Sequence, residues 1–280
     1  MKKYYITTPI YYVNDKPHIG HAYTTILADT LSRFRTLIGE QSFFLTGLDE
    51  HGLKVQQAAE KNKVTPEVHC DTMAPAFIEL WEKLNINYSD FIRTTEKRHT
   101  TIVQDILKQV YENGDIYQDE YEGWYSISEE RFITEKEVES GLFGEAKKIK
   151  EKNYFFKMSK YQSELIEKIE SDELSIQPKS RKNEVLGFLK QELSDLCISR
   201  PKSRLEWGIE IPFDKDYVTY VWFDALINYI SAPKYSEDNK NFKLHWPADV
   251  HLIGKDILTT HSVYWPTMLM SLNLPMPKAI

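Results

Sequence analysis

Apolar and polar residues recur at different spacings along the chain, and each spacing predicts a strand or a helix. Residues 4–13 form a run of β-branched and aromatic side chains that is typical of a buried strand. Residues 19–37 place apolar side chains three and four positions apart, as an amphipathic helix does. The same analysis predicts a strand at 42–46, helices near 50–61, near 66–84 and at 97–112, strands at 217–223 and 249–253, and helices at 224–232 and 255–272.

Strands and helices alternate at both ends of the chain, a pattern typical of a parallel sheet with crossover helices. The middle differs, because it has short aromatic strand-like pieces, turn glycines and then helical stretches. We therefore predict an α/β fold, a doubly wound parallel, Rossmann-like sheet that is split by an inserted connective domain. The expected division gives residues 1–115 to the first half of the sheet domain, 116–199 to the insertion and 200–280 to the second half.

The composition of the 280 residues is that of a soluble globular protein, with 41% hydrophobic and 28% charged residues. No stretch is long enough to span a membrane, so no membrane partner is expected. Cys70 and Cys197 lie far apart, which favours neither a disulfide framework nor a cysteine zinc site and indicates a cytoplasmic protein. The net charge of −7 does not indicate a nucleic-acid binder, although the basic excess in residues 177–204 would suit either a phosphate backbone or solvent.

Two histidines stand where the first predicted strand gives way to a helix. Pro17 precedes His18, and His21 follows three positions after His18. Backbone N–H groups and the positive end of the helix dipole gather at a helix N-terminus, which makes it an anion site. Imidazoles three positions apart lie on the same side and can donate hydrogen bonds to phosphate oxygens. The alternative is a pair of helix-capping histidines that carry no chemistry.

The segment from His18 to His21 resembles the HIGH signature of class I aminoacyl-tRNA synthetases and related nucleotidyltransferases. The longer segment of residues 7–22, TTPIYYVNDKPHIGHA, resembles methionyl-tRNA synthetases in particular. The resemblance implies a methionine–tRNA ligase, which activates methionine with ATP to methionyl-adenylate and transfers the methionyl group to tRNA(Met). It implies ATP with Mg²⁺ as cofactor, His18, Gly20 and His21 as ATP contacts, and both histidines as catalytic residues.

Asp49 follows the predicted strand that contains Leu45. Ligands of open α/β sheets bind at the carboxyl ends of strands, so Asp49 is expected in the same crevice as the two histidines. A carboxylate there can hold a substrate ammonium group by a charge-assisted hydrogen bond. Aspartate is also suited to cap a helix, and the two roles are compatible. The resemblance implies that Asp49 contacts the amino group of methionine.

Residues 220–229 place four side chains on one helix face: Trp222, Ala225, Leu226 and Tyr229. Asp224, in the same segment, is expected to cap the helix. Such a face is more often ordinary core, but beside a crevice it can hold a thioether, which makes favourable contacts with aromatic rings. The resemblance implies that this face lines the methionine side chain. Leu226 stands where the family commonly has proline, so the shape of this wall is expected to differ.

Residues 251–261 contain another strand-to-helix turn, at Gly254, which offers a second helix N-terminus to an anion or a ribose. His261 shares a helix face with Ile257 and is either a pocket residue or a hydrogen-bonded core histidine. The resemblance implies that Gly254 and Asp256 bind ATP, Asp256 at the ribose. It implies five further contacts to methionine: Ile10, Tyr12, Ile257, Thr260 and His261.

Two further ATP contacts follow from the resemblance of residues 198–212 to the family. Arg200 is implied at a phosphate and Glu210 on the ribose or adenine side. Without the resemblance, both would be interpreted as ordinary surface charges.

The chain departs from the family where many members carry zinc. The corresponding segments, residues 125–128 and 141–144, contain no cysteine. Serine does not supply the thiolate that structural zinc needs, so we expect no zinc and no protein-bound metal.

The chain also lacks the family's KMSKS loop, whose lysines neutralise the triphosphate. Lys157-Met158-Ser159-Lys160 resembles it but precedes Trp222, so we interpret it as the start of a helix in the inserted domain. The true loop is expected after a strand that begins near residues 277–280. We therefore expect the chain to be an N-terminal catalytic fragment, without the lysine loop and the anticodon-binding domain, and impaired by itself.

Two other functions remain open. A non-catalytic module that binds methionine, nucleotide or tRNA is compatible with the missing lysine loop. Another HIGH-type nucleotidyltransferase is disfavoured, because the methionine-pocket segments match the family in order across residues 4–279. The sequence predicts no oligomeric state.

Overall fold

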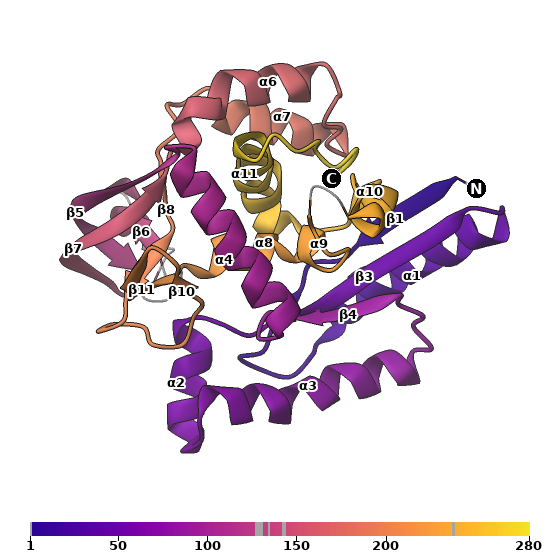
Figure 1. Cartoon of the computed structure of the whole chain (residues 1–280), viewed down its shortest axis with the longest axis horizontal. Coiled ribbons are helices and arrows are strands. Elements are labelled where there is room, and N and C mark those ends of the chain that lie inside the picture. Colours follow the sequence, from indigo (N-terminus) through magenta and orange to yellow (C-terminus); the bar gives the residue numbers. More distant parts are fainter. Residues whose placement is uncertain (1, 127–130, 134, 142–143, 237–238) are drawn as a thin grey trace.

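The centre of the molecule is a parallel five-stranded sheet (Figure 1). The computed structural model describes residues 2–126, 131–133, 135–141, 144–236 and 239–280. Strands β12, β1, β3 and β2 follow one another in the sheet, and β4 also pairs with β3. Their bounds are Lys3–Thr7 for β1, Tyr11–Tyr12 for β2, Gln41–Asp49 for β3, Asp90–Arg93 for β4 and Val250–His251 for β12. The predicted parallel sheet is confirmed.

The single strand predicted at 4–13 is wrong, because the structure has two strands there. Thr7 at the end of β1 pairs with Leu45, and pairing resumes with Tyr11 opposite Leu48. One extra residue therefore separates the two paired stretches, as in a β-bulge. Pro9 lies in this interruption and has no N–H to donate to a strand ladder.

Two helices of the first half have the predicted bounds, but only one of them buries the predicted apolar face. The two are α1 (Ile19–Leu37) and α4 (Lys97–Glu112), and the Asn113-Gly114 stop follows α4 directly. Only α4 buries its apolar face, because Ile26, Leu27 and Phe34 of α1 are exposed. Helix α2 (Leu53–Asn62) starts later than predicted, and α3 covers Pro66–Lys83. Helix α4 packs into the largest hydrophobic cluster through four apolar side chains: Val103, Ile106, Leu107 and Val110.

The chain between α4 and the last strand of the main sheet forms two smaller antiparallel sheets. One has the order β6-β5-β7-β8 and the other the order β10-β11-β9. The bounds are Ile116–Ser126 for β5, Arg131–Ile133 for β6, Ala146–Phe156 for β7, Leu196–Cys197 for β8, Ser199–Pro201 for β9, Glu210–Ile211 for β10 and Asp214–Thr219 for β11. The predicted insertion into the parallel sheet is thus confirmed, while its exact bounds stay a prediction.

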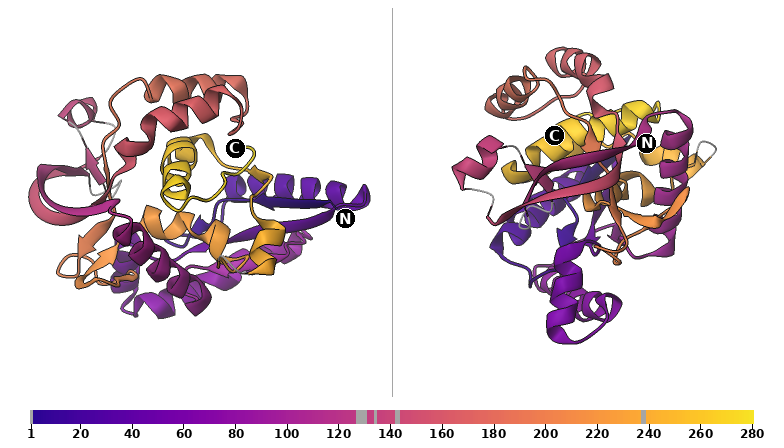
Figure 2. Two further views of the ribbon diagram at one scale, coloured as in Figure 1. Left: turned by 45° about the horizontal axis from the view of Figure 1, so that its top comes forward. Right: turned by 90° about the vertical axis from the view of Figure 1, so that its left-hand side faces the viewer.

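The insertion also carries helices. Helix α5 covers Glu135–Ser140, the 3-10 helix η1 Met158–Tyr161, α6 Gln162–Glu170 and α7 Lys179–Phe188. In Figures 1 and 2 the β5–β7 ribbon lies at one end of the molecule, and α6 and α7 lie beside α11.

The last part of the chain contradicts one prediction and refines another. The strand ends at Thr219 and helix α8 (Val221–Leu226) starts before Asp224, so Asp224 does not cap it. The helix predicted at 255–272 is present, since residues 255–271 are helical throughout, but it changes type along its length: it starts as the 3-10 helix η2 (Lys255–Ile257), continues through a π-helical turn η3 (Thr260–Tyr264) and ends as α11 (Trp265–Ser271). Helices α9 (Asn228–Ser231) and α10 (Lys240–His245) lie between α8 and β12.

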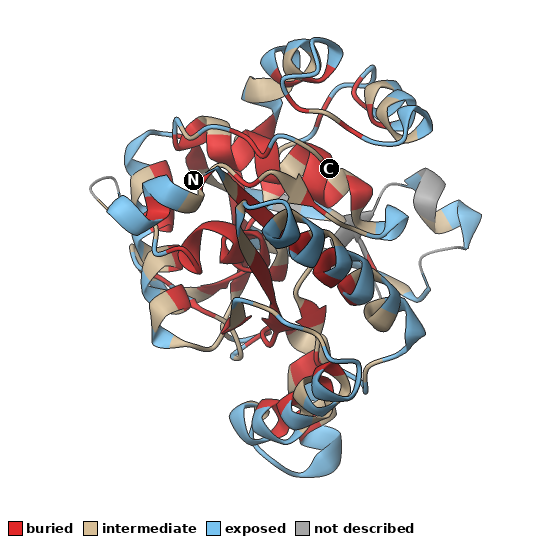
Figure 3. Cartoon of the chain, turned by 90° about the vertical axis from the view of Figure 1, so that its right-hand side faces the viewer, coloured by how far each residue is buried: buried red, intermediate tan, exposed pale blue. Residues whose placement is uncertain are grey.

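Buried residues gather in the parallel strands and on the inner faces of the helices that cover them (Figure 3). Trp81, Trp265, Tyr5 and Tyr229 are the largest fully buried side chains. None of the helices in the described ranges is long and apolar enough to cross a membrane.

Candidate active site

His18 and His21 form a reciprocal cap at the start of α1. The Gly20 N–H donates to His18 Nδ1 at 3.1 Å, and the His18 N–H donates to His21 Nδ1 at 3.3 Å. The two rings stack with centroids 3.7 Å apart. A neutral imidazole whose Nδ1 accepts a hydrogen bond carries its proton on Nε2. The capping role therefore leaves both Nε2–H groups to donate to a ligand, and the two interpretations of these histidines are compatible.

The surroundings of His21 keep its ring uncharged. Burial is the main cause that lowers the pKa of His21 to about 4, and the neighbouring His18 lowers it further. The Tyr11 ring lies 4.5 Å from that of His21, and the Phe77 ring lies 5.8 Å away. His21 at neutral pH thus offers an N–H dipole rather than a full positive charge.

Gly20 allows the His18 ring to fold over the helix start. A Cβ atom at Gly20 would stand 2.9 Å from His18 Cε1, closer than a normal contact. A side chain here would displace the ring from its capping position.

Asp49 is the last residue of β3 and is buried, with 7% of its surface exposed. The strand register places Tyr12 of β2 directly opposite Asp49. Asp49 does not cap α2, whose N-cap is Gly52, so that alternative is wrong. Two of the predicted methionine contacts are therefore neighbours at the carboxyl end of the sheet.

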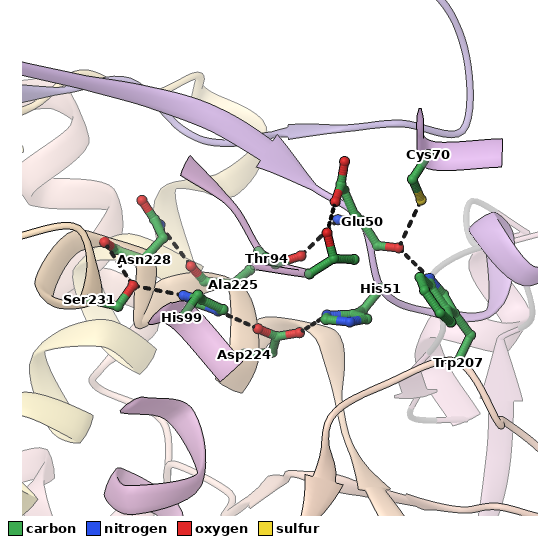
Figure 4. Close-up of polar contacts among 11 residues, drawn as sticks. Glu50, His51, Cys70, Thr94, His99, Trp207, Asp224, Ala225, Asn228 and Ser231 are labelled. Atoms are coloured by element: carbon green, nitrogen blue, oxygen red, sulfur yellow. Dashed lines mark hydrogen bonds and ion pairs between the residues drawn. The ribbon is translucent and has the colours of Figure 1, made fainter. Parts of the chain in front are cut away.

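Polar contacts around Glu50 hold the turn that follows β3 (Figure 4). The Glu50 side chain is fully buried and accepts hydrogen bonds from Arg93 Nε at 2.7 Å and from the Thr95 hydroxyl. Its backbone N–H donates to Thr94 Oγ1 at 3.0 Å, and its carbonyl accepts the Trp207 indole N–H. Hydrogen bonds to both the backbone and the side chain of Glu50 therefore fix the turn.

Asp224 lies fully buried between two histidines (Figure 4). His51 Nδ1 contacts one carboxylate oxygen at 2.6 Å, and His99 Nε2 contacts the other at 2.6 Å. His99 Nδ1 in turn lies 2.7 Å from Ser231 Oγ. Burial by itself would raise the Asp224 pKa, but the charge and hydrogen bonds of His51 and His99 lower it to about 2. Asp224 is therefore an ionised buried carboxylate.

The predicted methionine wall lies on α8 and α9. Ala225, Leu226 and Tyr229 are buried and Trp222 is half-buried. Ile10 packs against the hydrophobic cluster that includes Leu226 and Tyr229.

The Tyr229 hydroxyl lies 2.7 Å from His261 Nε2, and His261 Nδ1 lies 3.0 Å from the Ile257 carbonyl. The carbonyl can only accept, so Nδ1 carries the proton and Nε2 accepts from Tyr229. Burial lowers the His261 pKa to about 4. Tyr229, His261 and Ile257 are thus brought together, and Thr260 lies beside His261 in the π-helical turn.

A match of the sequence to a known protein family identifies the family of this chain. The sequence matches the family of tRNA synthetases class I (M) over residues 4–142 and 139–280. The chain belongs to this family. It is 51% identical over 285 residues to the methionine–tRNA ligase of Clostridium acetobutylicum, and 46% identical over 294 residues to that of Bacillus subtilis. It spans 44% of the length of each of these relatives.

Solved structures of the same family share the fold. Mycobacterium tuberculosis methionyl-tRNA synthetase in complex with methionyl-adenylate superposes with a TM-score of 0.95 at 40% identity, covering 100% of this chain and 56% of that one. The free form of the M. tuberculosis protein gives 0.83 at 38% identity, covering 100% and 55%. The structure of this tRNA synthetase chain thus agrees better with the adenylate complex than with the free form.

The residues predicted to contact ATP are mostly exposed, whereas those predicted to contact methionine are buried or half-buried. Gly254 precedes η2, the 3-10 turn with which the helical segment of residues 255–271 begins. Asp256 on it is exposed, with its carboxylate 2.7 Å from Lys255 Nζ. Glu210 is also exposed, and its ion pair with Lys202 lowers its pKa.

Arg200 is not the surface charge that the composition alone suggested. It is 3% exposed, its guanidinium lies 4.4 Å from the Tyr220 ring centroid, and Nη1 donates to the Ser199 carbonyl at 2.6 Å. Other members of the basic stretch form ion pairs: Arg181 with Glu184, Lys182 with Asp172, and Arg204 with Glu151. These pairs weaken the expectation of a phosphate-binding surface there.

The segment that resembles the lysine loop is tied to the parallel-sheet half. Lys160 Nζ lies 2.6 Å from the carboxylate of Asp115, which is 2% exposed, and Lys157 Nζ donates to the Gly114 carbonyl at 2.8 Å. η1 starts at Met158 and leads into α6, so the predicted helix start is confirmed.

Sequence reasoning missed the roles of His51, His99 and Trp207. His51 stands two residues after Asp49, which was a usable signal. His99 has no such signal, because its carboxylate partner lies 125 positions further along the chain.

Among the described residues, no group of three or more His, Cys, Asp or Glu side chains is arranged to hold a metal ion. Four residues of the segments that carried the zinc prediction, 127–128 and 142–143, lie outside the described ranges. The prediction of no zinc therefore stays a prediction.

Proposed function

We propose that this chain forms the core that activates methionine with ATP in a methionine–tRNA ligase, and that the whole protein then transfers the methionyl group to tRNA(Met). The observation that carries the proposal is the match of the complete chain to a methionyl-tRNA synthetase holding methionyl-adenylate, at a TM-score of 0.95. The chain covers less than half of its relatives' length, so the complete activity belongs to the whole protein.

In the proposed reaction, a carboxylate oxygen of methionine attacks the α-phosphorus of ATP. A new P–O bond forms, the bond to the β-phosphate oxygen breaks, and pyrophosphate leaves. No side chain of the protein forms a covalent intermediate. The catalytic task is to align the reactants and stabilise the charge on the phosphate oxygens. ATP would enter as its Mg²⁺ complex.

His18 and His21 are the proposed catalytic residues. Their Nε2–H groups would donate to the phosphate oxygens, and the positive end of the α1 dipole would favour the negative charge there. Support comes from the reciprocal cap, which fixes the tautomer of both rings.

Asp49 is proposed to hold the ammonium group of methionine. Support comes from its burial and from its place at the carboxyl end of β3, beside Tyr12. A charge-assisted hydrogen bond in such a buried position is stronger than a neutral one.

The proposed pocket for the methionine side chain is formed by apolar and aromatic residues of three segments: Ile10, Tyr12, Trp222, Ala225, Leu226, Tyr229, Ile257, Thr260 and His261. Since the Tyr229 hydroxyl and His261 already bond each other, shape rather than a polar contact would select the thioether. Shape selection is limited, because one methylene group is worth about 1–3 kcal/mol in such a pocket. Leu226 in place of the family's proline would alter one wall.

The ATP-side roles are proposals with weaker geometric support. Gly254 and Asp256 would contact the ribose, and the exposure of Asp256 leaves it accessible to a ligand. Arg200, proposed at a phosphate, is buried over the Tyr220 ring in the structure. Glu210 would have to exchange its pairing with Lys202 for the nucleotide.

Methionine-dependent pyrophosphate–ATP exchange by the intact protein tests the proposal. Exchange that requires methionine, and that other amino acids do not support, is the expected result. Exchange driven by another carboxylic acid would refute the methionine assignment. Calorimetric binding of methionine without any exchange would instead favour a non-catalytic binding module.

A further inference from the structure

Asp224 connects parts of the chain that the insertion separates. It follows His51 by 173 residues and His99 by 125 residues, yet both imidazoles contact its carboxylate at 2.6 Å. His51 comes from the turn after β3, and His99 comes from the first turn of α4. The three side chains are buried, at 6% exposure for His51 and 0% for the other two. The contact therefore joins the two halves of the parallel-sheet domain inside the protein (Figure 4).

The residues on either side of this contact belong to the proposed methionine site. His51 stands two positions after Asp49, the proposed partner of the ammonium group. Asp224 stands between Trp222 and Ala225, which belong to the proposed side-chain wall. The hydrogen bond between His51 and Asp224 is thus the short polar connection between the two ends of the pocket.

We propose that His51 and Asp224 are positioning residues for methionine, and that their hydrogen bond sets the distance between Asp49 and the wall on α8. This inference rests on the proposed function. His51 Nδ1–H is the donor, because an ionised carboxylate can only accept. His99 holds the second oxygen and is itself bonded to Ser231, so the carboxylate cannot rotate away from His51.

The turn that carries Asp49 is rigid on its other side as well. Arg93, Thr94 and Trp207 hold Glu50, which stands between Asp49 and His51. The turn is therefore a fixed reference, and the bond between His51 and Asp224 sets where α8 and its wall lie relative to Asp49. Small misplacements of a binding group cause large losses in a pre-organised site.

Conservative substitutions separate this positioning role from packing. The amide nitrogen of asparagine reaches about the place of histidine Nδ1, while that of glutamine reaches about the place of Nε2. His51 uses Nδ1, so His51→Asn should keep the methionine KM within about threefold, whereas His51→Gln should raise it about tenfold or more. His99 uses Nε2, so His99→Gln should be the milder change and His99→Asn the more severe one.

A packing role predicts the same order at both sites, because glutamine is nearer to histidine in volume. Equal effects of the two substitutions at His51, or a milder effect of glutamine there, would overturn the inference. Reversal of the order between the two histidines would support it.

Asp224→Asn gives an independent measurement. An amide placed between two N–H donors can accept from only one of them, so the methionine KM should rise about tenfold or more while the ATP KM changes less than about twofold. Asp115→Asn is the matched control, since Asp115 is also a buried carboxylate, bonded to Lys160, Tyr161 and Ser271. It should lower the melting temperature but leave the methionine KM unchanged.

All variants are measured by pyrophosphate–ATP exchange in the intact protein, with far-UV circular dichroism to confirm folding. An unchanged methionine KM in Asp224→Asn, or an equal rise for methionine and ATP, would overturn the inference. If Asp224→Asn does not fold, the histidine substitutions decide the question. If the unaltered protein shows no methionine-dependent exchange, the proposed function itself is refuted. The variants test only the positioning role of His51 and Asp224.

Discussion

Hydrogen bonds at single ring nitrogens decide what the histidines of this chain can do. His18 and His21 use Nδ1 for the helix cap, which directs both Nε2–H groups toward a ligand. His261 has the opposite pattern, because both of its nitrogens are engaged within the protein. His18 and His21 thus keep an N–H group available for the proposed ligand, whereas His51 and His261 use their ring nitrogens to hold parts of the fold together.

His21→Asn should lower the adenylation rate about 100-fold, the effect of losing one donor to developing charge, with a much smaller change in methionine affinity. Asparagine can still accept the His18 N–H, but it does not reach the place of Nε2. His21→Gln is the matched variant and should lose less. Stopped-flow adenylation rates and equilibrium methionine binding measure the two effects, and comparable losses of both would contradict the catalytic role.

The pKa of His261, about 4, predicts acid sensitivity of the fold. The unfolded chain, with the ordinary value of 6.5, binds more protons between these two values, so the free energy of unfolding falls as pH drops below about 6.5. This histidine should contribute about 1–2 kcal/mol of that fall between pH 6.5 and about pH 5. Urea unfolding of His261→Gln should show a correspondingly smaller pH dependence; an equal dependence would exclude His261 as a cause.

At the scale of elements, the site depends on interruptions of regular structure. The extra residue between β1 and β2 brings Tyr12 opposite Asp49. The π-helical turn η3 carries Thr260 and His261. Single π-helical turns inside longer helices are frequent at functional sites. Spacing along the sequence predicted one strand where the structure has two, and one helix where the structure has a continuous helical segment of changing type.

The close approach of β3 and β4 makes Gly47 intolerant of a side chain. A Cβ atom there would lie 2.0 Å from the backbone oxygen of Ile92, so Gly47→Ala must force the two strands apart. We expect a loss of about 3 kcal/mol or more in the free energy of unfolding.

Gly187→Ala on α7 is the control, because nothing lies within 4 Å of a Cβ there. It should gain up to about 1 kcal/mol from helix propensity. Urea unfolding compares the two variants. Near-equal stabilities would show that β3 and β4 yield more easily than their spacing indicates.

At the scale of the molecule, hydrogen bonds join the insertion to the parallel-sheet domain at several places that are far apart in the sequence. Asp115, at the end of the first half, bonds Lys160 and Tyr161 of the insertion and Ser271 of α11. Residues 175–177 pair with residues 278–280, which also bond to residues 248–251 beside β12. The insertion and the parallel sheet are therefore expected to unfold together.

Lys160→Gln tests whether residues 157–160 serve to connect the insertion to Asp115. Loss of the ion pair with buried Asp115 should lower the free energy of unfolding by about 1 kcal/mol, since Lys160 is itself half exposed. The ATP KM should stay within about twofold of the unaltered value. A tenfold rise in the ATP KM without loss of stability would instead make this segment a triphosphate-binding loop.

The sequence predicted those features of the fold that depend on residues close together in the chain. The apolar spacing in α4 gave its bounds, because that helix buries one continuous apolar stripe. The bounds of α1 were also predicted, although its apolar side chains Ile26, Leu27 and Phe34 are exposed in the structure. The positions of Asp49 and Gly254 were predicted as well, because a strand-to-helix turn is visible in the residues directly around it. The contact of Asp224 with His51 and His99 was out of reach, since nothing within a window of 20 residues records a partner more than a hundred positions away. Asp224 was accordingly predicted as a helix cap.

That separation has a consequence for the protein as it is made. A ribosome adding about 5–20 residues per second delivers His99 on the order of ten seconds before the carboxylate that will hold it. During that interval the nascent first half contains His51 and His99 but not the carboxylate that both contact in the folded chain. Residues 221–231, which carry part of the proposed methionine pocket, emerge only after the insertion, so we expect the proposed site to complete its folding after the insertion has been translated.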